Sequence, residues 1–226
     1  MKTVSGREWT LLAIILIYSF VPTFGGLLRV VELAGGSAIV PENLRALADP
    51  LPIVLHILSS FLFCLVGALQ FLPSVRRYHV RTHRALGRVV VIAGFTSAMT
   101  GLWMTYSYVF PQDLQGALLF WVRIALSLSM VGLLVRAVAA IRLGQVRKHS
   151  AGMLRAYAIG QGASTQAVFG IGWLVLFGTE PTGLLRDVLM VSAWAANLLI
   201  AEILIGRTSV PRTLAPFLSP GWQGGP

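Results

Sequence analysis

Long apolar stretches recur along this sequence, and they limit what the chain can fold into. Six stretches of mostly apolar residues are separated by short segments that hold most of the charged residues. A helix of about 20 apolar residues spans the hydrocarbon core of a bilayer, where every backbone polar group must find a partner within the protein. We therefore expect six transmembrane helices, at about residues 9–28, 51–72, 85–107, 115–141, 152–177 and 184–206.

The composition indicates lipid rather than water as the solvent. Hydrophobic residues make up 56% of the 226 residues, charged residues make up 12%, and the mean hydropathy is +0.77. Soluble domains are about a quarter charged, so this composition excludes a soluble enzyme domain. It also excludes a disordered chain, which needs low hydrophobicity. The predicted fold class is all-α: one polytopic bundle of about six transmembrane helices over residues 1–206, followed by an irregular tail at 207–226.

The basic residues lie in alternate connections between the predicted spans. The net charge is +10, from 18 Lys and Arg against 8 Asp and Glu. The N-terminus and the segments 74–84, 142–149 and 207–226 are basic, whereas the intervening connections hold most of the acids. Because cytoplasmic connections carry an excess of Lys and Arg, both termini are predicted to be cytoplasmic. The charge is therefore an orientation signal, and we expect the lipid bilayer rather than nucleic acid as the partner.

Familiar catalytic motifs are missing from the sequence. There is no Gly-rich phosphate loop and no Gly-x-Ser-x-Gly nucleophile motif. The single cysteine, Cys64, lies in an apolar stretch and forms neither an intrachain disulfide nor a thiolate metal site. No group of histidine, cysteine and acidic residues with the spacing of a complete ligand set predicts a metal centre. Candidate functional residues must therefore be sought among the polar groups inside the spans.

One group of ionisable residues is predicted in the cytoplasmic third of the membrane. Such residues are costly within spans and usually face the interior of a bundle. The depth of each residue follows from its position along a span, at about 1.5 Å of helical rise per residue. On that scale this layer contains histidines, arginines and only one acid, Glu202. We expect Glu202 to pair with Arg155 or Arg88, and the alternative is that the arginines extend to the headgroups. The group consists of His83, Arg88, Arg136, His149, Arg155 and Glu202.

A sparser group is predicted towards the outer side. His56, Ser60 and Gln70 recur at helical spacing along the second span, and Arg123 lies about two turns into the fourth. A histidine and an arginine around a cavity suit an anionic or quinone headgroup. Arg123 has no acid in its own helix, so it needs a bound anion, water or an acid from a connection, namely Asp49, Asp113 or Asp187.

Several of these residues belong to motifs that resemble a known family. The motifs are Pro52 with His56-Ile57, Gly67-Ala68-Leu69-Gln70-Phe71, His83-Arg84-x-x-Gly87-Arg88, Gly101-Leu102-Trp103-Met104-Thr105, His149-x-x-x-Met153-x-Arg155-Ala156-Tyr157-Ala158, and Asn197 to Glu202. In this order, over about residues 51–206, they resemble the bacterial predicted membrane protein family called domain of unknown function 2306. The resemblance implies a multi-pass protein of the bacterial inner (plasma) membrane. It implies no particular reaction, so whether the protein is an enzyme stays open.

The sharpest functional hypothesis is a b-type haem site for electron transfer. His83 and His149 begin the third and fifth spans on the same side of the membrane, and haem iron is commonly held by histidine. The pair is similar to one haem site of di-haem cytochromes b, with Arg88 and Arg155 as propionate partners. Against the hypothesis, both histidines lie at the membrane edge. His56 also has no histidine partner on the fourth span for a second haem.

Two other classes of function remain open. A transporter of a small solute or anion is suggested by polar groups at two depths, and Gly160 and Gly162 would let the fifth span bend or break. Such a transporter would need to form a homodimer. Alternatively, the chain is a non-catalytic accessory subunit of a larger membrane complex, in which its tryptophans are interfacial anchors.

Overall fold

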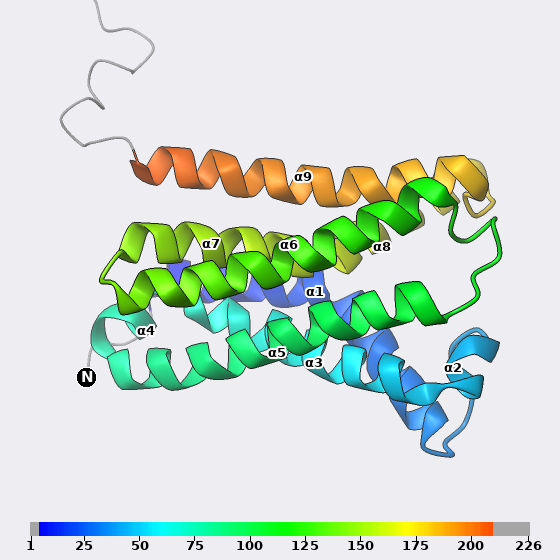
Figure 1. The fold of residues 1–226 in the computed structure, drawn as a ribbon, viewed down its shortest axis with the longest axis horizontal. Coiled ribbons are helices and arrows are strands. Elements are labelled where there is room, and N and C mark those ends of the chain that lie inside the picture. Colours follow the sequence, from blue (N-terminus) through cyan, green and yellow to red (C-terminus); the bar gives the residue numbers. More distant parts are fainter. Residues whose placement is uncertain (1–4, 210–226) are drawn as a thin grey trace, which may run out of the picture.

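The computed structural model describes residues 5–209, and within this range its regular elements are all α-helices. The long helices lie side by side and form an elongated bundle (Figure 1). This confirms the predicted all-α membrane bundle. The tail predicted at 207–226 lies outside the described residues beyond Ser209. The helices are α1 (Gly6–Leu33), α2 (Leu44–Ala48), α3 (Pro50–Gln70), α4 (Pro73–Tyr78), α5 (Val80–Ser107), α6 (Ala117–Arg142), α7 (Val146–Gly160), α8 (Gly162–Phe177) and α9 (Gly183–Ser209).

Five of these helices, α1, α3, α5, α6 and α9, are long and apolar enough to cross a membrane, in the part of the chain that the structure describes. They correspond to five of the six predicted spans. The span expected at 152–177 is instead two helices, α7 of 15 residues and α8 of 16 residues. Each is shorter than the roughly 20 residues that a crossing needs. They follow one another along the bundle (Figure 1), so a single crossing by both together remains a prediction.

The connections gather at the two ends of the bundle. The start of α1, the short helix α4, the turn between α6 and α7, and the end of α9 lie at one end, which we call the α4 end (Figure 1). The short helix α2 and the segments 108–116 and 178–182 lie at the other, the α2 end. The basic connections of the sequence meet at the α4 end. The positive-inside rule therefore predicts that this end faces the cytoplasm.

Side chains fix where the helices begin at the α4 end. Ser5 accepts a hydrogen bond from the amide of Glu8, and the carboxylate of Glu8 accepts one from the amide of Ser5 at 2.9 Å, which is a capping box. The same carboxylate accepts the amide of Ser74 at 2.6 Å. Ser74 follows Pro73 in the first turn of α4. Glu8 therefore caps α1 and ties it to the start of α4.

One aromatic ring holds the centre of the bundle together. Phe63 on α3 is fully buried, and its ring lies between Gly94 of α5 and Gly160 of α7. A Cβ atom at either glycine would approach a ring carbon of Phe63 to 2.5 Å. Non-bonded carbons prefer about 3.5–4.0 Å, so neither position has room for a side chain. Small residues at such positions let helices approach closely, and here they lock α3 against α5 and α7.

We predict that Gly94→Ala and Gly160→Ala each destabilise the protein by about 1–3 kcal/mol, because the added methyl group must displace the Phe63 ring. Thermal unfolding of the purified protein in mild detergent measures this. Gly132→Ala and Gly170→Ala are matched controls, since a Cβ at either helical position meets nothing within 4 Å. Equal unfolding temperatures for the Gly94 and Gly132 variants would contradict the packing described.

Candidate functional site

Two histidines converge at the α4 end. His83 and His149 occupy the first turns of α5 and α7 and are close enough for their charges to interact. The Nδ1 atom of His149 lies 3.0 Å from the carbonyl oxygen of Ala137 on α6. A carbonyl only accepts, so this Nδ1 carries the proton and the Nε2 atom keeps its lone pair. The Nδ1 atom of His83 is buried and has no hydrogen-bond partner among residues 5–209. The site therefore combines one imidazole with a fixed neutral tautomer and one with a buried ring nitrogen that lacks a partner.

The carboxylate of Glu202 is already paired with an arginine. Of the two arginines considered for Glu202, the structure places Arg155 against it. The Nε and Nη2 atoms of Arg155 lie 2.5 and 2.7 Å from the two carboxylate oxygens. The side chains are 35% and 51% exposed, so the pair contributes about 0–1 kcal/mol and mainly ties α7 to α9. Arg88 and Arg136 are exposed on α5 and α6. They are therefore placed to extend towards headgroups or a ligand.

Towards the α2 end, the structure brings three of the four residues predicted for the outer side together. The Nδ1 atom of His56 lies 3.0 Å from the carbonyl oxygen of Ser97 on α5. Ser60 contacts the same residue, with 2.7 Å between the two hydroxyl oxygens. Arg123 lies within range of the charge of His56 and donates a hydrogen bond to Gln115. His56, Ser60 and Arg123 are thus neighbours, and the contacts of the two α3 residues are with α5.

Gln70 does not join this group. It lies 14 residues beyond His56 on the same helix, which is about 21 Å of helical rise, and so sits at the α4 end. A Cβ at Gly87 of α5 would lie 3.5 Å from its side-chain oxygen. Helical spacing placed His56 and Gln70 on one face of α3, but it carries no information about their separation along the helix axis.

Asp187 lies within range of the charge of Arg123 but caps a helix instead of pairing with it. Asp187 is 1% exposed. Its carboxylate oxygens accept the amides of Gly116 and Leu119 at 3.0 and 3.1 Å. These are among the amides that the first turn of α6 leaves without a helical partner. Asp187 therefore caps α6 from α9, and Arg123 is left with a neutral hydrogen-bond acceptor.

The fifth predicted span is interrupted at Gln161, which ends α7 and precedes α8. Its side-chain nitrogen donates to the hydroxyls of Tyr157 and Ser19 at 2.8 and 2.9 Å, and its oxygen accepts from Ser164 at 2.8 Å. The Tyr157 hydroxyl donates to the backbone carbonyl of Cys64 at 2.7 Å. The interruption is thus surrounded by a buried polar network that joins α1, α3, α7 and α8.

Side chains also satisfy the carbonyls that end α7. Asn197 donates its side-chain amide to Ala158 at 3.2 Å, and Trp194 donates its indole N–H to Ile159 at 3.1 Å. The Cys64 thiol lies 3.8 Å from the carbonyl oxygen of Gly160. Asn197 in turn accepts from Thr165 at 2.7 Å and from Tyr18 at 3.2 Å. The interruption therefore leaves these three carbonyls bonded within the protein, as the interior of a membrane requires.

Sequence reasoning gave no role in this network to Cys64 or Trp194. The sequence placed Cys64 in an apolar stretch, and the tryptophans were considered only as interfacial anchors of an accessory subunit. The signal that could have found them is Gly160-Gln161-Gly162, a polar residue between two glycines inside an apolar stretch. A helix interrupted there leaves carbonyls that need donors from neighbouring spans.

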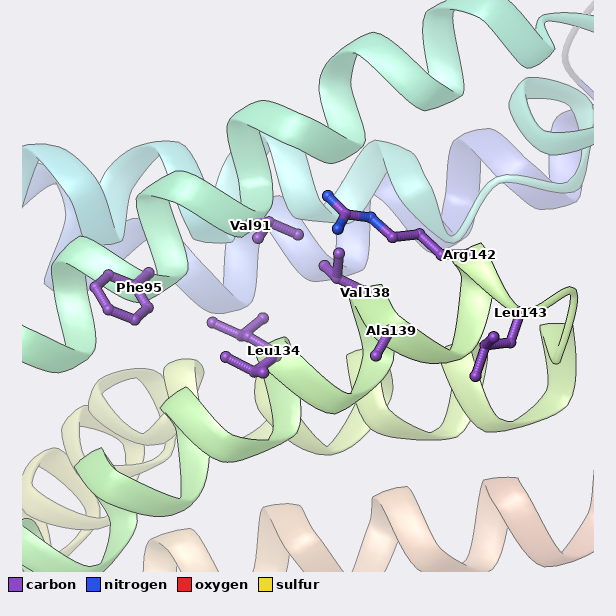
Figure 2. A pocket seen from close by; sticks show the side chains of 8 residues that line it. Val91, Phe95, Leu134, Val138, Ala139, Arg142 and Leu143 are labelled. Carbon is purple, nitrogen blue, oxygen red and sulfur yellow. The ribbon is translucent and has the colours of Figure 1, made fainter.

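A groove between α5 and α6 is mainly apolar, unlike the polar groups described above. Its volume is about 490 Å³, and apolar side chains line it except at the α4 end. Figure 2 shows Arg142 reaching from the last turn of α6 across the mouth of this groove towards α5. The apolar lining suits a lipid acyl chain and provides no polar path through the bundle. The lining residues are Val91, Phe95, Leu134, Val135, Val138, Ala139, Arg142 and Leu143.

We predict that Asn197→Leu, which keeps the approximate size, destabilises the protein by about 1–3 kcal/mol, because the Ala158 carbonyl and the Thr165 hydroxyl lose their partner in an apolar interior. Unfolding in detergent measures the change. Gln166→Met is the control, since Gln166 makes one partly buried bond to the Met190 carbonyl at 3.2 Å. The network has no structural importance if both variants unfold alike.

The long apolar helices and the buried network at the interrupted span define a polytopic helical membrane protein. The chain belongs to the predicted membrane protein family DUF2306, whose family model matches residues 53–205. The matched region begins in α3 and ends in α9, so it includes His56, His83, His149, Arg155 and Glu202. Comparison with curated proteins and with solved structures gave no match.

Proposed function

We propose that this protein is a multi-pass protein of the bacterial inner membrane that binds b-type haem through His83 and His149. The observation that carries the proposal is the convergence of the two imidazoles, one with a fixed tautomer and one with a buried ring nitrogen that lacks a partner. Histidines are common axial ligands of haem iron. Both helices that present them start at the end of the bundle with the basic connections.

The donor groups of this site fit the proposed cofactor. The hydrogen bond from His149 to the Ala137 carbonyl fixes the orientation of the ring and its neutral tautomer, as bonds behind metal-binding histidines do. Arg155 is held by Glu202, which leaves Arg88 as the proposed partner for a propionate. When bound, haem would supply reversible one-electron transfer, and the surrounding residues would set its potential.

We predict that the purified protein, reconstituted with haemin and reduced, shows the Soret and α bands of a low-spin b-type haem. His83→Ala and His149→Ala should each lose the low-spin α band and shift the Soret band, because each variant lacks one axial ligand. His56→Ala is the control, since its imidazole is at the α2 end and bonded to Ser97. Wild-type protein without a Soret band, or a His149→Ala variant with an unchanged spectrum, would overturn the proposal.

A second candidate is transport of a small solute or anion, and the interrupted span favours it. Many transporters bind their substrates where membrane helices are discontinuous, near the middle of the bilayer. Here the helix breaks at Gln161, and the neighbouring Tyr18, Thr165 and Asn197 offer neutral hydrogen-bonding groups. Protein that lacks haem but mediates uptake of labelled anions into reconstituted vesicles would favour this candidate. A role as an accessory subunit would instead require a stable membrane partner that co-purifies.

A further inference from the structure

Three arginines from three helices meet at the α2 end, away from both features discussed above. Arg45 lies on α2, Arg123 in the second turn of α6 and Arg186 in the first turn of α9. The guanidinium carbons of Arg45 and Arg123 lie 4.7 and 5.2 Å from the centre of the same Phe110 ring. Arg45 and Arg186 both lie within range of the charge of Arg123. We call these three residues the arginine cluster.

Nearby acids do not neutralise the arginine cluster. Asp187 is the closest in charge range, but the backbone amides at the start of α6 occupy its two oxygens. The charges of Asp49 and Arg45 are both within range of the Tyr108 hydroxyl. However, no ion pair links Asp49 to any of the three arginines. Three positive charges therefore share this end of the bundle with three carboxylates, Asp49, Asp113 and Asp187, and the carboxylate of Asp187 is already engaged.

Two donors of the cluster lack hydrogen-bond partners. The Nε atoms of Arg45 and Arg186 are buried and unpaired among the residues that the structure describes. Leaving a buried donor of a charged group unpaired costs free energy. A phosphate has several acceptor oxygens and pairs well with guanidinium groups, often through two bonds to one arginine. Such a ligand would satisfy both Nε donors and offset the repulsion between the three charges.

The surroundings place the cluster at the level of lipid headgroups. Val109, beside Phe110, is 87% exposed, Tyr106 in the last turn of α5 is 84% exposed, and Trp121 on the first turns of α6 is 65% exposed. Aromatic side chains of this kind mark the interface between membrane and water. Gln115, which accepts a hydrogen bond from Arg123, also lines a hollow of about 650 Å³ together with Asp113 and Asp187, and the three arginines lie outside that lining.

We propose that Arg45, Arg123 and Arg186 form a binding site for a phosphate group at the membrane surface of the α2 end. The phosphate is supplied either by the headgroup of an anionic phospholipid or by a phosphate-bearing solute. The Phe110 ring holds two of the guanidinium groups in place, and Gln115 orients Arg123.

Titration of the full-length protein in neutral detergent with phosphatidylglycerol tests the site, with tryptophan fluorescence as the readout. We expect Arg45→Gln and Arg186→Gln each to raise the apparent Kd at least about tenfold, the loss typical of one charge-assisted hydrogen bond. Arg147→Gln, an exposed position in the first turn of α7 at the opposite end of the bundle, is the matched control and should bind as the wild type does. Phosphatidylcholine, which has no net charge, should bind all variants equally.

Parallel titrations with inorganic phosphate identify the source. If millimolar inorganic phosphate displaces phosphatidylglycerol, the site exists and its ligand is a phosphate-bearing solute. If phosphatidylglycerol binds and phosphate does not displace it, the site exists and its ligand is a lipid. Gel filtration and thermal unfolding in phosphatidylcholine establish that each variant is folded. If Arg45→Gln does not fold, Arg186→Gln on another helix gives the same test. Wild-type affinity in the folded Arg45 and Arg186 variants, or an equal loss in Arg147→Gln, would overturn the proposal.

Discussion

The interior of a bilayer offers no hydrogen-bond partners, and the rest of this structure depends on how the chain meets that constraint at Gln161. An interrupted helix leaves carbonyl groups without amide partners. Here Asn197, Trp194 and Cys64 contact the three carbonyls that end α7. These donors come from α9 and α3, so satisfying the backbone also draws the neighbouring helices around the interruption.

Packing and hydrogen bonding coincide at this level of the bundle. The carbonyl of Gly160 faces the Cys64 thiol, while the space where a side chain would lie is filled by the Phe63 ring. On the next turn of α3, a Cβ at Gly67 would lie 2.6 Å from the Tyr157 ring. One face of α3 therefore alternates a large side chain with a small one against α7. That fit holds Tyr157 where its hydroxyl meets both Gln161 and the Cys64 carbonyl.

The sequence predicted those parts of the structure that depend on hydropathy. Long apolar stretches predicted the helices and their order, and the alternating basic segments matched the grouping of connections at two ends. Hydropathy averages over a window of residues, so it merged α7 and α8 into one span. The glycines Gly160 and Gly162 did indicate that this span could bend or break, and the two helices meet between them. Helical spacing put Gln70 on the face of His56 but ignored its depth. The partners of Arg123 and Asp187 depend on how α6 and α9 meet, which no single-helix pattern contains.

The polar features are arranged in three levels along the bundle. The histidine pair lies at the α4 end, the neutral network around Gln161 lies within the bundle, and the arginine cluster lies at the α2 end. Charged groups thus sit towards the surfaces, where water and headgroups reduce the cost of ionisation, and the interrupted helix is sealed by neutral groups. This arrangement requires α7 and α8 to cross the membrane together.

That crossing is the central claim, and cysteine accessibility tests it most directly. Arg147→Cys and Glu180→Cys place one thiol at the start of α7 and one after α8, while Cys64 is only 5% exposed and should stay unlabelled. A membrane-impermeant maleimide should label the Glu180→Cys variant on intact cells and the Arg147→Cys variant only in inverted vesicles. Labelling of both positions from the same side would show that α7 and α8 enter and leave by one face, and would contradict the account.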